Sequence, residues 1–119
     1  MMDIVHIFIS TGRFRSFDEI HLFIDETYSE DGDGIDSEFM AETGFAQYEP
    51  GCIEAVLSES GEAVPLKQLL DGTSYCEQWL LKLDITRLAD AAICVFSPNE
   101  IEHPDQSSME YLGKFHYQR

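Results

Sequence analysis

The sequence predicts a single α+β domain, in which a four-stranded sheet, mixed or antiparallel, is covered by helices on one face. The chain has 119 residues, enough for one hydrophobic core and too few for two. Hydrophobic residues make up 44% of it, which is typical of a globular chain rather than a disordered one. Apolar runs with strand and helix periods follow one another along it. We therefore expect one globular domain over residues 1–119, with elements in the order β-α-α-β-α-α-β-β.

The first strand and helix are the clearest local predictions. Residues 4–9 (IVHIFI) form a nearly continuous apolar, β-branched run, which is typical of a buried strand in the centre of a sheet. Ser16 and Glu19 match a capping box, and apolar residues recur behind them at helical spacing. We therefore expect a helix over residues 17–28.

The middle of the chain predicts a loop, a second helix and a second strand. An acidic loop occupies residues 29–36, and a short helix is expected over residues 37–43, where Gly44 ends it. Residues 52–58 alternate well enough for a strand.

The C-terminal half predicts two helices followed by two strands. A short helix begins at Pro65, and another is expected over residues 74–83. Residues 91–96 form a buried strand and residues 109–117 the last one, and we expect these two to pair antiparallel. One face of the last strand would carry Met109, Tyr111, Phe115 and Tyr117. The aromatic residues expected on inner faces are Phe8, Phe17, Phe23, Trp79, Phe96 and Phe115.

Charge is the unusual feature of the composition. The chain has 23 Asp and Glu against 7 Lys and Arg, a formal net charge of -16. Between Ser16 and Leu66 there are fourteen acidic residues and no Lys or Arg. Such a surface repels nucleic acid and anionic membranes, and it attracts cations or a basic protein. A role in solubility alone is the simpler alternative.

The acidic loop resembles a calcium-binding EF-hand loop but does not match one. With Gly34 at the sixth position, the twelfth is Met40, which cannot chelate. With Asp31 at the first position, the fifth is Ile35 and the sixth is Asp36. Both frames fail at essential positions, so we expect no metal site here. The loop is either a solvated turn between helices or an acidic docking surface.

No pattern in the sequence marks a catalytic or cofactor site. A nucleophile elbow, a P-loop and a dinucleotide fingerprint are all missing, and the histidines form no metal-binding cluster. We expect no enzyme activity, no catalytic residues and no cofactor. Two alternatives stay open: an acidic adaptor or regulator of another basic protein, and a small enzyme with a carboxylate or divalent-metal site.

Cysteine usage and hydropathy favour a cytoplasmic protein. Cys52, Cys76 and Cys94 are odd in number, lie far apart and sit in apolar patterns, as reduced buried thiols do. No apolar run is long enough to span a membrane, and the N-terminus lacks the basic region of a signal peptide.

Four short segments together resemble a family of small bacterial immunity proteins. They are the strand at 4–9, EDGDG at 30–34, GCIE at 51–54 and EYLGKF at 110–115. The family is immunity protein 22 of polymorphic-toxin and contact-dependent growth inhibition systems. The resemblance implies a non-catalytic cytoplasmic antidote, which binds the C-terminal domain of a cognate toxin, often a nuclease.

An acidic surface suits a basic nuclease toxin, so the acidic segment is the expected contact region. We expect a monomer or a weak homodimer, since the last strand could pair at a sheet edge unless Lys114 and His116 guard it. The residues expected to contact the toxin are Glu30, Asp31, Asp33, Asp36, Glu38 and Glu42, with Phe39 and Tyr48 as apolar anchors.

Overall fold

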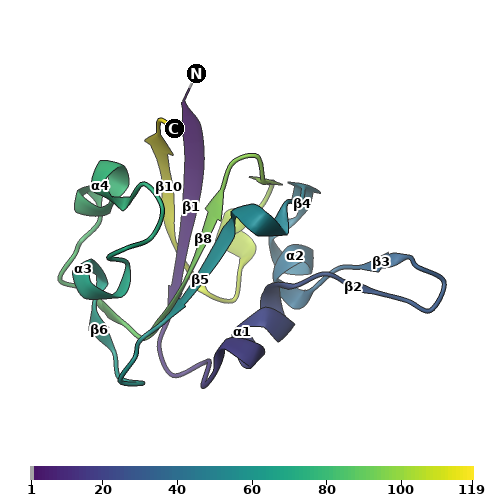
Figure 1. Ribbon diagram of the computed structural model, residues 1–119, viewed down its shortest axis with the longest axis horizontal. Coiled ribbons are helices and arrows are strands. Elements are labelled where there is room, and N and C mark those ends of the chain that lie inside the picture. The colour runs from purple at the N-terminus through teal and green to yellow at the C-terminus, as the bar shows by residue number, and fades with distance from the viewer. Residues whose placement is uncertain (1) are drawn as a thin grey trace.

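A four-stranded antiparallel sheet forms the centre of the computed structural model, which describes residues 2–119 (Figure 1). The strand order is β10-β1-β8-β5, and each neighbouring pair is antiparallel. The N-terminal strand lies inside the sheet, as its apolar run predicts. The last two strands do not pair with each other, contrary to expectation, because β1 lies between them. The strands are β1 (Asp3–Ser10), β5 (Ile53–Leu57), β8 (Ala91–Phe96) and β10 (Glu110–Tyr117).

Helices cover both faces of this sheet rather than one (Figure 1). Side chains of β1 alternate between the faces and are buried on both, so each face needs its own cover. Helices α1 (Phe17–Ile24) and α2 (Glu38–Thr43) pack on one face, and α3 (Leu66–Leu69) and α4 (Cys76–Trp79) on the other. Within residues 2–119, no helix has the length and apolar character needed to cross a membrane.

Two hydrophobic cores result, one on each face. The α1–α2 core contains Phe8, Ile20, Phe23, Ile24, Phe39, Ala91, Ile93, Val95 and Met109. The α3–α4 core contains Val5, Ile7, Ile9, Leu66, Leu69, Leu70, Trp79, Leu80, Ala89, Ala92, Cys94, Phe96 and Tyr117.

Six short strands lie between the main elements, and the expected order lacks them. They form three two-stranded pairs: β2 (Thr27–Tyr28) with β3 (Gly34–Ile35), β4 (Phe45–Gln47) with β9 (Glu100–Ile101), and β6 (Val64–Pro65) with β7 (Leu88–Ala89). Helix α1 therefore ends at Ile24 instead of residue 28, because Thr27 and Tyr28 are extended. Short 3-10 turns occur at η1 (Pro50–Cys52), η2 (Leu80–Lys82) and η3 (Pro104–Gln106).

A β-bulge in β10 overturns the expectation that one face of this strand carries all its large side chains. Ile7 lies opposite Gly113 and Phe8 opposite Tyr111, so Leu112 is the extra residue. Gly113 has φ +119°, which side-chain-bearing residues rarely adopt. After the bulge the faces exchange: Met109 and Tyr111 pack on the α1–α2 core, and Phe115 and Tyr117 on the α3–α4 core.

Of the aromatic residues expected inside, Phe17 is the exception. It is the first residue of α1 and is 52% exposed. It lies on the same helical face as Ile20 and Ile24 but at the first position of the helix, where the side chain stays largely in solvent.

His6 is a buried titratable group in the central strand. Its Nδ1 lies 2.9 Å from the hydroxyl of Tyr111. Burial, and secondarily the charge of Lys114 opposite it, lowers the pKa of His6 from 6.5 to about 4. The unfolded chain therefore takes up a proton at this residue before the folded one does. The stability contributed by neutral His6 is present above pH 6.5 and is lost as pH falls toward about 4.

We expect His6→Gln to flatten this pH dependence. The free energy of unfolding of the wild type should fall relative to the variant between pH 6.5 and about 4. The difference in slope has a limit of about 1.4 kcal/mol per pH unit for one proton. Urea unfolding followed by circular dichroism across this range measures it. Parallel pH profiles for the two proteins would contradict the assignment.

Candidate functional site

The acidic loop is the tip of a β-hairpin that projects from the body of the molecule (Figure 1). Thr27 pairs with Ile35, and Tyr28 with Gly34. At the tip, the Ser29 N–H donates to the Asp33 carbonyl over 2.9 Å. We call residues 25–36 the acidic hairpin. The segment is therefore not a simple turn between two helices.

The base of the acidic hairpin is held by two hydrogen-bonded side chains. The hydroxyl of Ser37 accepts from the Met40 N–H, capping α2, and donates to the Ile24 carbonyl at the end of α1, each over 3.1 Å. The hydroxyl of Tyr48 accepts from the Glu26 N–H over 3.3 Å. Ser37 is buried, so the first link is shielded from water. The hairpin thus leaves the body at a defined place.

Four carboxylates of the acidic hairpin are free to meet a partner. Glu30, Asp31, Asp33 and Asp36 are exposed. Within residues 2–119, their side chains make no hydrogen bond and no ion pair. Their charges are therefore uncompensated by nearby cations of the same chain.

The other two predicted carboxylates bind within the fold. Glu38 forms an ion pair with Arg13 over 3.2 Å, and Glu42 accepts from the N–H and hydroxyl of Ser108 over 2.8 and 2.9 Å. The Arg13 guanidinium also lies 4.3 Å from the ring centre of Phe23. Glu38 remains exposed, but both residues hold α2 against the rest of the domain.

Phe39 is fully buried, so its prediction as an exposed anchor is wrong. Its ring lies 5.0 Å from that of Phe8, 5.5 Å from Phe23 and 5.9 Å from Phe45. The apolar side of α2 faces the sheet, and Phe39 is its largest residue. Tyr48 is half-buried and packs edge-on against Phe45. Burial raises the pKa of the Tyr48 hydroxyl.

Apolar groups that sequence reasoning missed lie beside the free carboxylates. Tyr28 is 68% exposed and Ile35 49% exposed, one on each strand of the acidic hairpin. Nearby Glu26, through a hydrogen bond and its charge, raises the pKa of the Tyr28 hydroxyl. The sequence signal was present: strand-forming Thr27–Tyr28 precedes a loop containing Asp-Gly, which is typical of a hairpin.

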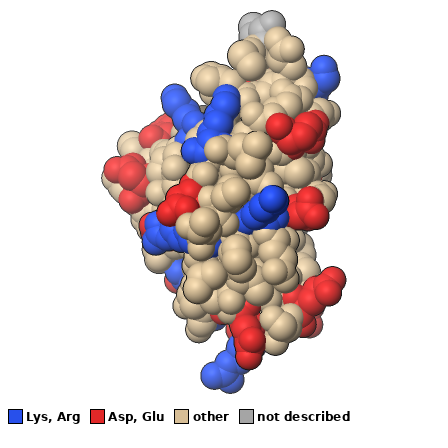
Figure 2. All heavy atoms as spheres, turned by 90° about the vertical axis from the view of Figure 1, so that its left-hand side faces the viewer, with Lys and Arg blue, Asp and Glu red and all other residues tan. Residues whose placement is uncertain are grey.

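Charges of both signs lie on the side of the molecule that carries α3 and α4. Figure 2 shows the side that carries α3 and α4, where Lys and Arg lie among Asp and Glu. Five of the seven basic residues follow residue 66 in the sequence, whereas none lies between residues 16 and 66. The acidic hairpin belongs to the part of the chain without basic residues.

Among residues 2–119, no group of three or more His, Cys, Asp or Glu side chains is arranged so that it could hold a metal ion. The acidic hairpin that carries the free carboxylates is a thin two-stranded ribbon that projects from the body of the molecule (Figure 1). Such an arrangement suits contact with a surface.

The family model described as immunity protein 22 matches residues 5–118. The chain belongs to the immunity protein 22 family. The match covers both cores and the acidic hairpin, and it confirms the resemblance seen in the four short segments. The comparisons with curated proteins and with solved structures found no match. Membership of the immunity protein 22 family supports a general role in neutralising a toxin, with a toxin protein as the partner.

Proposed function

We propose that this chain neutralises the C-terminal domain of a cognate toxin by placing its acidic hairpin on a basic surface of that domain. The observation that carries the proposal is the set of four exposed, unpaired carboxylates at Glu30, Asp31, Asp33 and Asp36 on a projecting element. A nuclease is the favoured kind of toxin, because its active site must hold phosphates and is therefore basic.

The negative charge of this chain would speed its association with a basic toxin domain. The chain carries a net charge of -16, and a field of this sign steers a basic partner toward it. Steering raises association rates by a factor of roughly 10 to 10³. Speed matters to an antidote, since the toxin acts as long as it is free. Once bound, carboxylates over the phosphate-binding groups would exclude nucleic acid.

Apolar contacts would then hold the complex together. Charges at an interface mainly set specificity and association rate, whereas buried aromatic residues slow dissociation. Tyr28 and Ile35 are exposed on the acidic hairpin itself and take the role first expected of Phe39. Leu22, 80% exposed on α1, which leads into the hairpin, is a further apolar side chain open to the partner.

Co-expression with the gene immediately upstream in its genome tests the proposed function. We expect the tagged protein to co-purify with a basic C-terminal domain encoded there and to restore growth to cells producing that domain. A growth assay with and without this protein is the measurement. Recovery of the protein alone, with growth inhibition unchanged, would contradict the proposal.

Charge reversal on the hairpin tests the contact surface. The triple variant Asp31→Lys, Asp33→Lys and Asp36→Lys should slow association with the toxin domain by about tenfold or more. It should also flatten the dependence of the association rate on salt, because fewer opposite charges attract. Stopped-flow mixing over a salt series measures both effects.

The matched control reverses three exposed acids away from the hairpin: Glu77→Lys, Glu100→Lys and Asp105→Lys. It changes the net charge equally and should alter the rate much less. Equal slowing by the two triple variants would show that net charge acts without the hairpin.

Truncating the exposed tyrosine tests the anchor. Tyr28→Ala should raise the dissociation rate by about tenfold while leaving the association rate nearly unchanged. Leu81→Ala is the control, since Leu81 is 75% exposed next to α4 on the opposite face. Surface plasmon resonance gives both rates. A dissociation rate equal to that of the wild type would remove Tyr28 from the interface.

A further inference from the structure

Strand β5 forms an open edge of the main sheet. Among the described residues it pairs only with β8. The Ser58 N–H donates to the Asp90 carbonyl directly opposite, and bonding alternates along an antiparallel ladder. Glu54 and Val56 therefore bond to β8, and the backbone groups of Ala55 and Leu57 point away from the sheet. The bonding between β1 and β8 agrees with this assignment. The Ser97 N–H donates to the Ile4 carbonyl, so alternate residues of β8 bond to β1 and the residues between them bond to β5.

The two edges of the sheet are protected differently. The opposite edge, β10, carries the bulge and the exposed charged or polar residues Lys114 and His116, which discourage pairing with another strand. Along β5, the residues whose backbone faces outward are Ala55 and Leu57, which are apolar. The one charged residue of β5, Glu54, is held by the backbone and hydroxyl of Ser74. No other charged residue lies on β5 itself.

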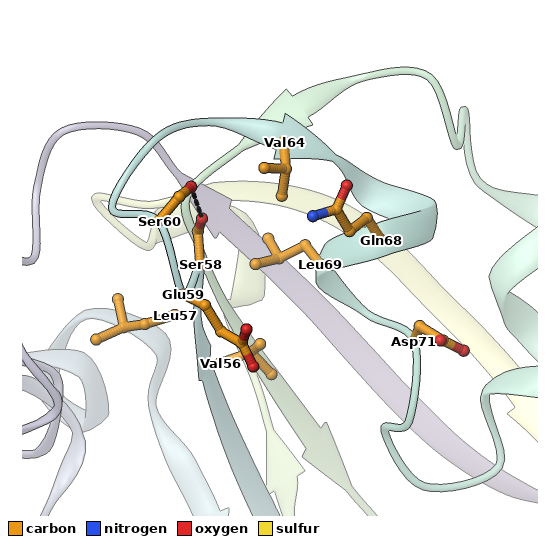
Figure 3. Close-up of a pocket in the computed structure, with 9 residues that line it drawn as sticks. All are labelled: Val56, Leu57, Ser58, Glu59, Ser60, Val64, Gln68, Leu69 and Asp71. Carbon is orange, nitrogen blue, oxygen red and sulfur yellow. Dashed lines mark hydrogen bonds between the residues drawn. The ribbon is translucent and has the colours of Figure 1, made fainter.

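Two cavities flank the end of β5. The first, of about 420 Å³, lies between β5 and α3 (Figure 3). Its lining combines apolar Val56, Val64 and Leu69 with the exposed carboxylates of Glu59 and Asp71. A second cavity of about 300 Å³ shares Leu57 and Ser58 with the first, and it is further lined by Gly12, Phe14, Arg15, Gly61 and Asp90.

We propose that β5 binds an extended segment of the toxin domain by strand addition, with a lysine or arginine of that segment in the cavity between β5 and α3. Alternate side chains of an added strand point to opposite faces, where the two cavities lie. The long alkyl stem would lie along Val64 and Leu69, and the cation would reach Glu59 and Asp71. This inference rests on the proposed function and adds a second contact to the acidic hairpin.

Charge selects a basic segment over a second copy of this chain. Two copies paired through β5 would each bring a net charge of -16 and would place the carboxylates flanking this edge close together. A basic segment relieves the repulsion that a second copy would create. Helix α1 contacts β5 and leads directly into the acidic hairpin, so one partner can approach both regions.

The test introduces a proline on the open edge. Ala55→Pro removes one outward N–H and leaves the bonds of Glu54 and Val56 to β8 intact. We expect it to weaken binding of the upstream-encoded C-terminal domain by about tenfold. His116→Pro is the matched control on β10, where alternation from the Ile4–Ser97 pair also directs the N–H outward. It should bind within about twofold of the wild type.

The binding test has three informative outcomes. Selective loss with Ala55→Pro supports strand addition. Equal binding by both proline variants, from a wild-type protein that restores growth, overturns strand addition and leaves the proposed function standing. A wild-type protein that neither binds the domain nor restores growth overturns both.

Amide hydrogen exchange in the wild-type complex keeps the test decisive if Ala55→Pro does not fold. By NMR, the amides of Ala55 and Leu57 should exchange at least about tenfold more slowly in the complex, while that of His116 should not change. Unchanged exchange at Ala55 and Leu57 would overturn the proposal. The pair Glu59→Gln and Asp71→Asn should also weaken binding, and Glu77→Gln with Glu100→Gln should not.

Discussion

The burial of Phe39 is the interaction on which the arrangement of the acidic hairpin depends. Its ring touches Phe8 in the central strand, Phe23 in α1 and Phe45 in β4. Removing such a ring from a core costs about 3–5 kcal/mol, so α2 is held firmly on the sheet. The start of α2 carries Ser37, which bonds to the end of α1. Packing in the core thereby decides where the two strands of the hairpin leave the body.

Local patterns predicted the elements that depend on neighbouring residues. The apolar run of β1 indicated a central strand, and Ser16 caps α1 as its motif predicts, accepting from the Glu19 N–H. Elements that depend on distant pairing were missed. The end of α1 depends on Thr27 meeting Ile35, and the faces of β10 depend on a bulge opposite β1. Phe39 occupies one position of a six-residue helix, too short for periodicity to reveal its buried side.

Charge and stability oppose each other in this protein. A net charge of -16 on 119 residues destabilises a compact state through self-repulsion, yet four hairpin carboxylates have no partner in the described part of the chain. The fold tolerates this because its two cores are independent of the hairpin and lie on either face of one sheet. Glu38 and Glu42 differ from these four carboxylates, because Arg13 and Ser108 of the same domain bind them. Carboxylates that stabilise the fold and carboxylates available to a partner thus lie within one short segment.

Hydrogen exchange measured by mass spectrometry, on this protein alone and with the upstream-encoded toxin domain, tests the central claim most directly. Amides of residues 25–36 should exchange more slowly in the complex, where the acidic hairpin would be covered. The peptides covering β10, at the opposite edge of the sheet, should exchange as in the free protein. Slower exchange confined to β10, with the hairpin unchanged, would contradict the proposed contact and move the binding surface to the opposite edge of the sheet.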